Sequence, residues 1–233
     1  MIEYTLKRSR RRKTVAIKVH QQSLTVYAPY GVAIAYIEQW LATKQAWINQ
    51  QVYKQSQHQD LRQFPLDSLQ IRLFDELLTL HFEINKTSCW QFFANMNPPQ
   101  LQVSCSGRVK KHTAMYQTQF EDFMREQLES YIEMRIRHYC SRMGEELPSN
   151  LKITTYKRRW GSCNQRRALT FNLLLVGAPH WVIDYVIVHE LAHLKYLNHS
   201  HRFWHRVSEF YPDYKYATQW LKQHGASLQW VFE

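Results

Sequence analysis

One short motif places the strongest constraint on how this chain can fold. Residues 189–193 read His-Glu-Leu-Ala-His. On a helix, side chains four residues apart project from the same face, so His189 and His193 can bind one metal ion together. Glu190 is then placed to act as a general base on a water molecule at that metal. Because the pattern carries this meaning only on a helix, it requires a helix over this segment.

The surrounding sequence supports that requirement. Residues 181–188 are almost entirely apolar, and Pro179 suits the first turn of a helix, so we predict a buried helix from about Pro179 through Leu194. Five histidines fall within residues 189–205, several times the average density of this chain, which favours a real metal site over a chance motif. Zinc is favoured over iron, because Glu190 suits hydrolysis and no redox ligand set is visible.

A zinc ion held by two histidines of one helix needs a third protein ligand and an open position for water. His199 lies six residues after His193, beyond an expected helix stop at Asn198, so the chain can turn back toward the metal. We therefore take His199 as the third ligand of one Zn²⁺ ion. The alternatives are His201, His205 and, if the ligand is a carboxylate, Glu209.

The charge balance favours anionic partners. Lys and Arg total 30 against 19 Asp and Glu, a formal net charge of +11. Residues 7–13, Lys-Arg-Ser-Arg-Arg-Arg-Lys, are the densest basic run, and they form either a solvated edge strand or a phosphate-binding patch for nucleic acid or nucleotide. Arg159 is a candidate for binding an anionic substrate or a developing oxyanion. The other interpretation of that segment is a turn at Gly161 with Trp160 in the core.

The pattern of apolar residues predicts an α+β fold. A hydrophobic fraction of 45% and a charged fraction of 21% exclude a disordered or low-complexity chain. The expected elements are strands at 14–19 and 24–28, an amphipathic helix near 34–53, short strands within 69–105, a long helix at about 113–143, strands at 151–154 and 168–174, and a helix near 214–224.

The composition changes from strand-like to helical near residue 110. We therefore divide the chain into a basic, β-rich region at 1–110 and a metal-binding catalytic region at 111–233, which could also form one continuous domain. No stretch approaches 18 consecutive apolar residues and the first residues lack an apolar leader, so we expect a cytoplasmic protein without membrane contact. The four cysteines contain no CxxC pair, which argues against disulfides and a thiolate zinc site.

The motifs together resemble those of the YgjP-like family of metal-dependent hydrolases, which is related to the SprT-like and other zincin metallopeptidases. The likeness is carried by Trp-Gly-Ser-Cys at 160–163, the motif at 189–193, Asn-His-Ser at 198–200, Phe-Trp at 203–204 and Pro-Asp-Tyr at 212–214, with Arg-Arg-Lys at 11–13 and Ala-Pro at 28–29. It implies a zincin-like half, with the active-site helix beside a small sheet.

The same resemblance implies that His189, His193 and His199 bind zinc and that Glu190 is the catalytic base. Metzincins place Gly three residues after the second motif histidine, whereas Tyr196 stands there in this chain, so that subgroup is not implied.

Three hypotheses for the function follow. The first is a zinc peptidase, in which Glu190 activates the attacking water and the strand at 168–174 receives the substrate by backbone pairing. The second is a metal-dependent pyrophosphatase or phosphohydrolase acting on a nucleoside triphosphate such as UTP, an activity that the resemblance implies. The third is a peptidase associated with nucleic acid through its basic surface. We favour the peptidase, because the chemistry of the motif suits a peptide best.

Overall fold

The computed structural model describes residues 4–20, 23–50 and 61–232. The chain divides into two compact units, Met1–Leu61 and Arg62–Glu233, each with its own hydrophobic core. The division lies at 61/62, not near residue 110 as the change in composition indicates. The reason is that the strands at residues 70–106 belong to the same core as the long helix that follows them.

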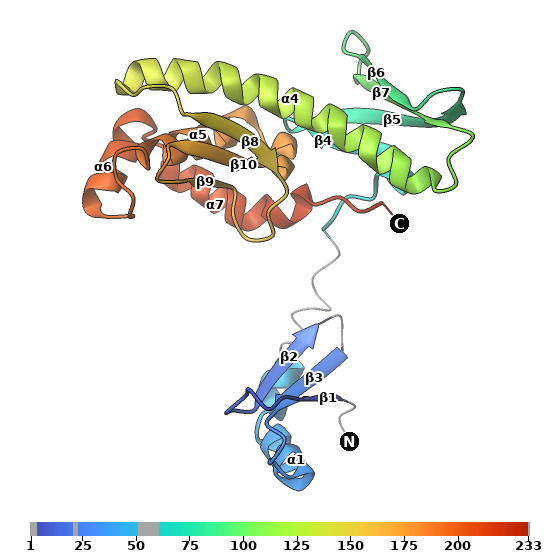
Figure 1. Cartoon of the computed structure of the whole chain (residues 1–233), viewed down its shortest axis with the longest axis vertical. Coiled ribbons are helices and arrows are strands. Elements are labelled where there is room, and N and C mark those ends of the chain that lie inside the picture. The colour runs from blue at the N-terminus through green and yellow to red at the C-terminus, as the bar shows by residue number, and fades with distance from the viewer. Residues whose placement is uncertain (1–3, 21–22, 51–60, 233) are drawn as a thin grey trace. The chain divides into compact units, whose positions relative to one another are not determined.

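The N-terminal unit is a three-stranded sheet with a helix, drawn in blue in Figure 1. Strands β2 (Ala16–His20) and β3 (Ser23–Ala28), which confirm the strands expected at 14–19 and 24–28, pair antiparallel, and β1 (Thr5–Arg8) pairs parallel with β3. Helix α1 (Ile34–Thr43) follows, and residues 45–50 are helical again after a break at Lys44. The end of the helix expected at 34–53 lies outside the described residues.

The C-terminal unit begins with a four-stranded sheet in the order β4-β5-β7-β6. Its strands are β4 (Gln70–Leu73), β5 (Glu76–Asn85), β6 (Cys89–Phe93) and β7 (Gln100–Ser106), preceded by the short helix α3 (Pro65–Ser68). Alternate residues such as Leu78 and Leu80 on β5 and Leu101 and Val103 on β7 are fully buried, which is the period expected of strands with one covered face.

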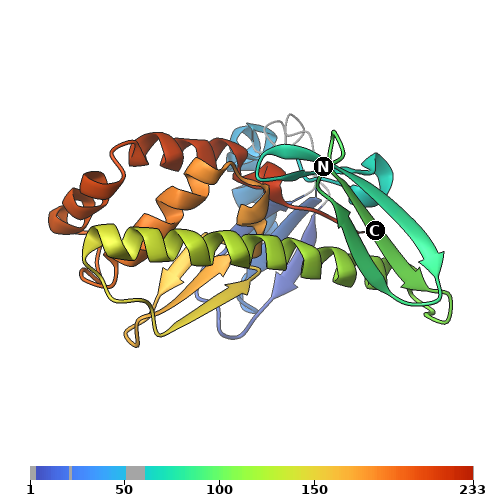
Figure 2. The same ribbon diagram turned by 90° about the horizontal axis from the view of Figure 1, so that it is seen from above.

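Helix α4 (His112–Met143) connects the two sheets of this unit. It ends as expected at Gly144, whose φ of 64° is the left-handed conformation typical of a helix C-terminus. The four-stranded sheet lies beside its N-terminal half, and the helices within residues 180–224 lie toward its C-terminal half (Figure 2). The second sheet, in the order β8-β10-β9, consists of β8 (Asn150–Thr154), β9 (Gly161–Cys163) and β10 (Ala168–Asn172).

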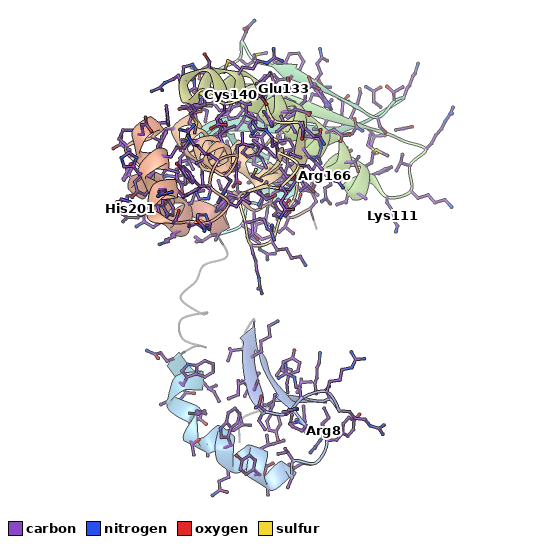
Figure 3. The ribbon with its side chains drawn as sticks, turned by 60° about the vertical axis from the view of Figure 1, so that its left-hand side comes forward. Arg8, Lys111, Glu133, Cys140, Arg166 and His201 are labelled. Atoms are coloured by element: carbon purple, nitrogen blue, oxygen red, sulfur yellow. The ribbon has the colours of Figure 1, made fainter. Side chains whose placement is uncertain are left out.

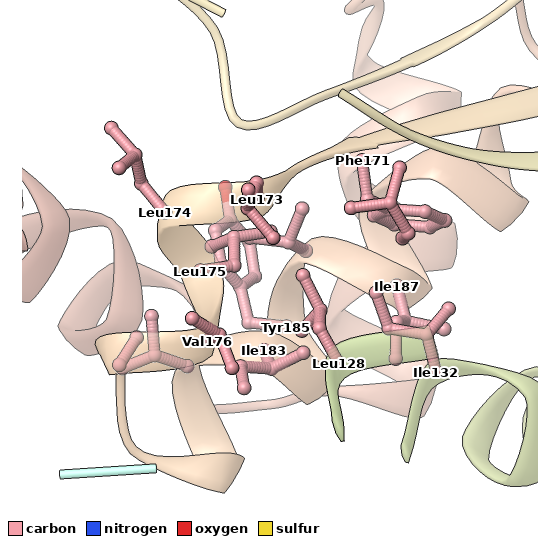
Figure 4. Packing of buried hydrophobic residues seen from close by; sticks show 14 of the residues in the cluster. Leu128, Ile132, Phe171, Leu173, Leu174, Leu175, Val176, Ile183, Tyr185 and Ile187 are labelled. Atoms are coloured by element: carbon pink, nitrogen blue, oxygen red, sulfur yellow. The ribbon is translucent and has the colours of Figure 1, made fainter. Parts of the chain in front are cut away.

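Helix α5 (His180–Ala192) occupies the centre of this unit. Figure 4 shows Leu128 and Ile132 of α4 lying against Ile183 and Ile187 of α5, and all four side chains are buried. The 3₁₀ segment η1 (Leu173–Gly177) leads into α5, and the chain ends with α6 (His201–Phe210), α7 (Tyr214–His224) and η2 (Gly225–Leu228). The mixed α+β class is therefore confirmed.

None of the helices in the described parts of the chain combines the length and the apolar character that crossing a membrane requires.

Candidate metal centre

The motif lies at the C-terminal end of the buried helix α5. The helix ends at Ala192 with His193 as its cap, two residues before the expected end at Leu194. The chain then reverses, and the backbone N–H of Tyr196 donates to the carbonyl of Ala192 at 3.0 Å. This early turn leaves enough chain before α6 for His199 to return to the motif.

Three imidazoles converge where the chain returns. One ring nitrogen from each of His189, His193 and His199 lies within 4.8 Å of the others, and Nε2 of His199 is 3.1 Å from Nε2 of His189. Helix α6 supports them, since the buried Phe203 ring lies 4.5 Å from His193 and the Trp204 ring stacks on His199 at 5.6 Å between centroids. The structure thus brings together the three residues that the sequence selects as metal ligands.

The protonation of His189 and His193 suits metal binding. Burial lowers the pKa of His189 to about 3, with smaller contributions from His193 and His199, and burial also lowers the pKa of His193. Neutral imidazole is the form that binds a metal. Nδ1 of His193 lies 2.9 Å from the carbonyl oxygen of Tyr196. Because that oxygen can only accept, Nδ1 carries the proton and Nε2 remains available as a ligand.

The spacing of the nitrogens fits a small divalent metal. Zinc binds imidazole at about 2.0–2.1 Å with tetrahedral geometry, which puts two ligand nitrogens about 3.3 Å apart. The distance between Nε2 of His189 and Nε2 of His199 is 3.1 Å. Three imidazole nitrogens are also a donor set that suits zinc. The residues present therefore fit the ion that the motif implies.

Glu190 lies beside this triad in an apolar environment. Its side chain is 4% exposed, and Oε2 has no hydrogen-bond partner among the described residues. Burial raises the pKa of the carboxyl to about 8, against a smaller lowering by the positive charge of Arg159. A buried carboxyl with one unpaired oxygen is a strong candidate for a group that exchanges protons with a substrate or water.

The side chain of Glu190 packs against Gly161 of β9, where only a residue without a side chain fits. A Cβ atom at Gly161 would lie 2.5 Å from Oε1 and 2.7 Å from Cγ of Glu190. The sequence suggests a turn at this glycine, whereas the structure shows a strand residue whose missing side chain accommodates the carboxylate. Trp160 packs against the core, and a Cβ atom at Gly225 would lie 2.6 Å from Cζ2 of its ring. The only sequence signal for this contact is the glycine itself.

A pocket of about 660 Å³ opens onto Glu190 and the three histidines. Arg159 and Lys222 both line it, and the guanidinium of Arg159 lies 5.2 Å from the centre of the Tyr156 ring. Cys163 also lines the pocket, but burial raises the pKa of its thiol to about 11, which leaves it protonated and a poor nucleophile. Arg159 is therefore next to the site, as expected, and Lys222 is a neighbouring cation that the sequence does not reveal.

The alternative third ligands lie elsewhere. His201, labelled in Figure 3, His205 and Glu209 line a separate pocket of about 320 Å³ with Arg206 and other residues. The only triad of possible ligands within the described residues is the one containing His199.

Asp184, five residues before His189, forms hydrogen bonds with side chains of α4. Arg135 Nη2 donates to its Oδ2 at 2.5 Å, and Tyr131 Oη donates to its Oδ1 at 2.9 Å.

The sheet beside α5 offers β9, not β10, for pairing with another chain. Strand β10 lies between β8 and β9, so both of its edges are already paired. The expectation that residues 168–174 receive a substrate is therefore wrong for backbone pairing. Strand β9 forms the edge of the sheet, and all three of its residues, Gly161, Ser162 and Cys163, line the pocket.

Known proteins resemble this chain in sequence and in part of its structure. The model of the YgjP-like family, a metallopeptidase domain, matches residues 13–224. No curated protein matches the chain. Among solved structures, a crystal structure of the metallopeptidase zymogen of Pyrococcus abyssi abylysin is 22% identical, with a TM-score of 0.37, and the match covers 40% of this chain and 93% of that chain.

Proposed function

Because the chain belongs to the YgjP-like family of metallopeptidase domains, we propose that it is a zinc-dependent peptidase of zincin-like architecture. The observation that carries this proposal is the convergence of His189, His193 and His199 beside the buried carboxyl of Glu190, at one end of one pocket. The architecture is supported by a motif helix, α5, packed beside the edge strand β9.

The three histidines would hold the metal through neutral imidazole nitrogens. When bound, a divalent zinc ion supplies Lewis acidity toward a carbonyl oxygen and positive charge that favours the ionised form of Glu190. The early end of α5 and the ring of Phe203 keep the imidazoles in place. These contacts reduce the conformational entropy that the ligands would lose on binding.

Glu190 would be the general base. Its ionised carboxylate takes a proton from the attacking water and then delivers that proton to the amine nitrogen of the leaving peptide. The apolar surroundings of Glu190 support this role, since they bring its pKa near neutral pH, where a group both accepts and returns a proton efficiently.

An extended peptide would bind along β9. This strand is at the edge of its sheet and its three residues line the pocket, so backbone N–H and C=O groups of a peptide would pair with it and present a carbonyl near Glu190. Arg159 and Lys222 would attract an acidic group of the substrate to the same pocket. These two cations also support the alternative, a phosphohydrolase acting on a nucleoside triphosphate, but the edge strand favours a peptide.

Replacing Glu190 with Gln tests the mechanism. Gln keeps the shape of the side chain and cannot act as a base, so we expect unchanged metal content and a loss of turnover of about 10²–10⁴-fold. The zinc-loaded protein and the variant are incubated in parallel with casein-type substrates and with a panel of nucleoside triphosphates. Wild-type turnover of a peptide by the variant would contradict the role of Glu190, and turnover of a nucleotide alone would replace the peptidase with the alternative.

Metal analysis of two variants tests the ligands. We expect His199→Ala to lose bound zinc, because it removes one of three nitrogens, and Glu209→Ala to retain it, because Glu209 lines a different pocket. The reverse result would assign the third ligand to Glu209.

A further inference from the structure

The N-terminal unit carries just over half of the net positive charge of the protein. Residues 1–61 contain nine Lys and Arg against three Asp and Glu, which leaves +6 of the total +11 in about a quarter of the sequence. This unit has its own core, built on Val26, Ala28 and Ile37, and contains none of the residues of the metal centre. The mechanism proposed above therefore gives no reason for its charge.

The exposed cations of this unit follow strand β1. Arg8, labelled in Figure 3, has a structural role, since its Nη1 donates to the carbonyl oxygens of Tyr30 and Val32 at 2.7 and 2.8 Å. Arg10, Arg11, Arg12 and Lys13 are exposed, and none of these four pairs with a carboxylate in the parts of the chain that the structure describes. Four neighbouring unpaired cations repel one another and favour a polyanion.

Aromatic rings lie among these cations. The guanidinium of Arg12 lies 4.7 Å from the centre of the Tyr27 ring, and that of Arg10 lies 5.9 Å from the Tyr30 ring. Tyr30 and Tyr36 are 62% and 57% exposed, respectively, far more than is usual for side chains that stabilise a core. Exposed rings beside arginines are the arrangement on which nucleobases stack.

A groove of about 610 Å³ begins at the end of the basic run. Lys13 lines it together with Val15, Val32, Tyr36 and Trp40. A cation at an opening lined by aromatic and aliphatic side chains can bind a phosphate while the adjacent base enters the groove. An anionic bilayer would be attracted by the same charges, but its flat surface cannot enter a groove. A duplex would present its phosphates, but its bases are already stacked on one another.

We infer that residues 4–20 and 23–50 form a binding module for single-stranded nucleic acid, with Arg10, Arg11 and Arg12 contacting phosphates and Tyr36 stacking on a base. This module is separate from the metal centre and does not depend on the proposed peptidase activity. The sequence leaves the basic run either as a solvated edge or as a phosphate-binding patch, and the exposed rings and the groove favour the second.

Fluorescence anisotropy with the full-length protein tests this inference. The probes are a labelled 15-nucleotide oligo(dT), a 15-base-pair DNA duplex and vesicles containing phosphatidylserine, each over a range of salt concentrations. We expect the single strand to bind most tightly. Changing Arg10, Arg11 and Arg12 together to Gln should reduce the slope of log K against log salt by about 2, since each lost phosphate contact removes about 0.7.

Two further variants separate charge from stacking. Tyr36→Ala should weaken binding of the single strand by about fivefold or more and leave the salt slope unchanged, because it removes stacking and no charge. The triple change of Arg108, Lys110 and Lys111 to Gln removes three exposed cations from the other unit. It should leave both the affinity for the single strand and the salt slope unchanged. Circular dichroism and thermal melting verify that each variant is folded.

Three results would overturn the inference. One is equal loss of affinity in the two triple variants, which would show only attraction to net charge. The second is binding of the duplex as tightly as the single strand. The third is binding of the vesicles without binding of the oligonucleotide, which would assign the basic surface to a membrane.

Discussion

Adding one methyl group at Gly161 should disable the site without touching a metal ligand. In Gly161→Ala the new Cβ would lie 2.5 Å from Oε1 of Glu190, whereas ordinary contact begins at 3.4 Å. The carboxylate must therefore retreat by about 0.9 Å or the strand must move by a similar distance. Misplacement of a catalytic group by about 1 Å costs about 10²-fold in rate. We expect kcat/KM for a peptide to fall by about that factor.

The assay compares kcat/KM, bound zinc and melting temperature for Gly161→Ala, wild type and a control, Gly31→Ala, whose Cβ would have no neighbour within 4 Å. Zinc content should stay the same, since the contact involves Glu190 and none of the histidines. A double-mutant cycle isolates the cause, because Gly161→Ala should have little further effect on activity or stability once Glu190→Ala has removed the opposing side chain. Wild-type kcat/KM in Gly161→Ala, or an equal loss of stability in both backgrounds, would refute this reasoning.

Two further predictions concern stability. In the metal-free protein, the raised pKa of Glu190 keeps its carboxyl protonated between pH 4.5 and about 8, whereas the same carboxyl is ionised in the unfolded chain. The free energy of unfolding should therefore fall as the pH rises through that window. Glu190→Gln should remove that contribution in denaturation series with a chelator from pH 4 to 9, and identical pH profiles would contradict it. Asp184→Asn should lower the free energy of unfolding by about 3 kcal/mol, because it leaves the partly buried Arg135 without its carboxylate partner. A change in melting temperature no larger than that of a surface substitution would argue against this prediction.

The elements that could be predicted are those with strong local signals. The helix expected near 214–224 is α7 (Tyr214–His224), and the expected end near Gly144 is the end of α4. Helix α6 was not predicted, although Phe203, Val207 and Phe210 recur in it at helical spacing. Strand β9 has three residues, too few to show the alternation that identifies a strand.

The domain boundary depends on contacts that composition does not encode. Strands at 14–28 and at 70–106 look alike in sequence, yet the first group packs with α1 and the second with α4. Which core a strand joins is decided by tertiary pairing. For example, β5 and β7 pair in parallel although β6 lies between them in the sequence. A change in composition near residue 110 reports only where one type of element gives way to another.

The site divides in the same way between local and distant contacts. The spacing of His189 and His193 on one helix, and a short return to His199, can be read from the sequence because they involve eleven consecutive residues. The contact of Gly161 with Glu190 joins β9 to α5, and the proximity of Lys222 joins α7 to the same pocket. Both follow from packing between elements far apart in the chain, so no local pattern contains them.

The candidate metal centre combines a buried carboxyl with imidazole nitrogens that a cation could bind together. The buried carboxyl of Glu190 has an oxygen without a partner, and His189 and His199 bring two ring nitrogens to 3.1 Å of each other. Burial keeps His189 neutral, and in that state it offers an unshared electron pair to the same point in space. One dication at that point would satisfy the imidazoles and favour the ionised carboxylate at once. Binding of a metal ion should therefore stabilise the folded unit, since the ion would bind the ligands as the fold arranges them and not the unfolded chain.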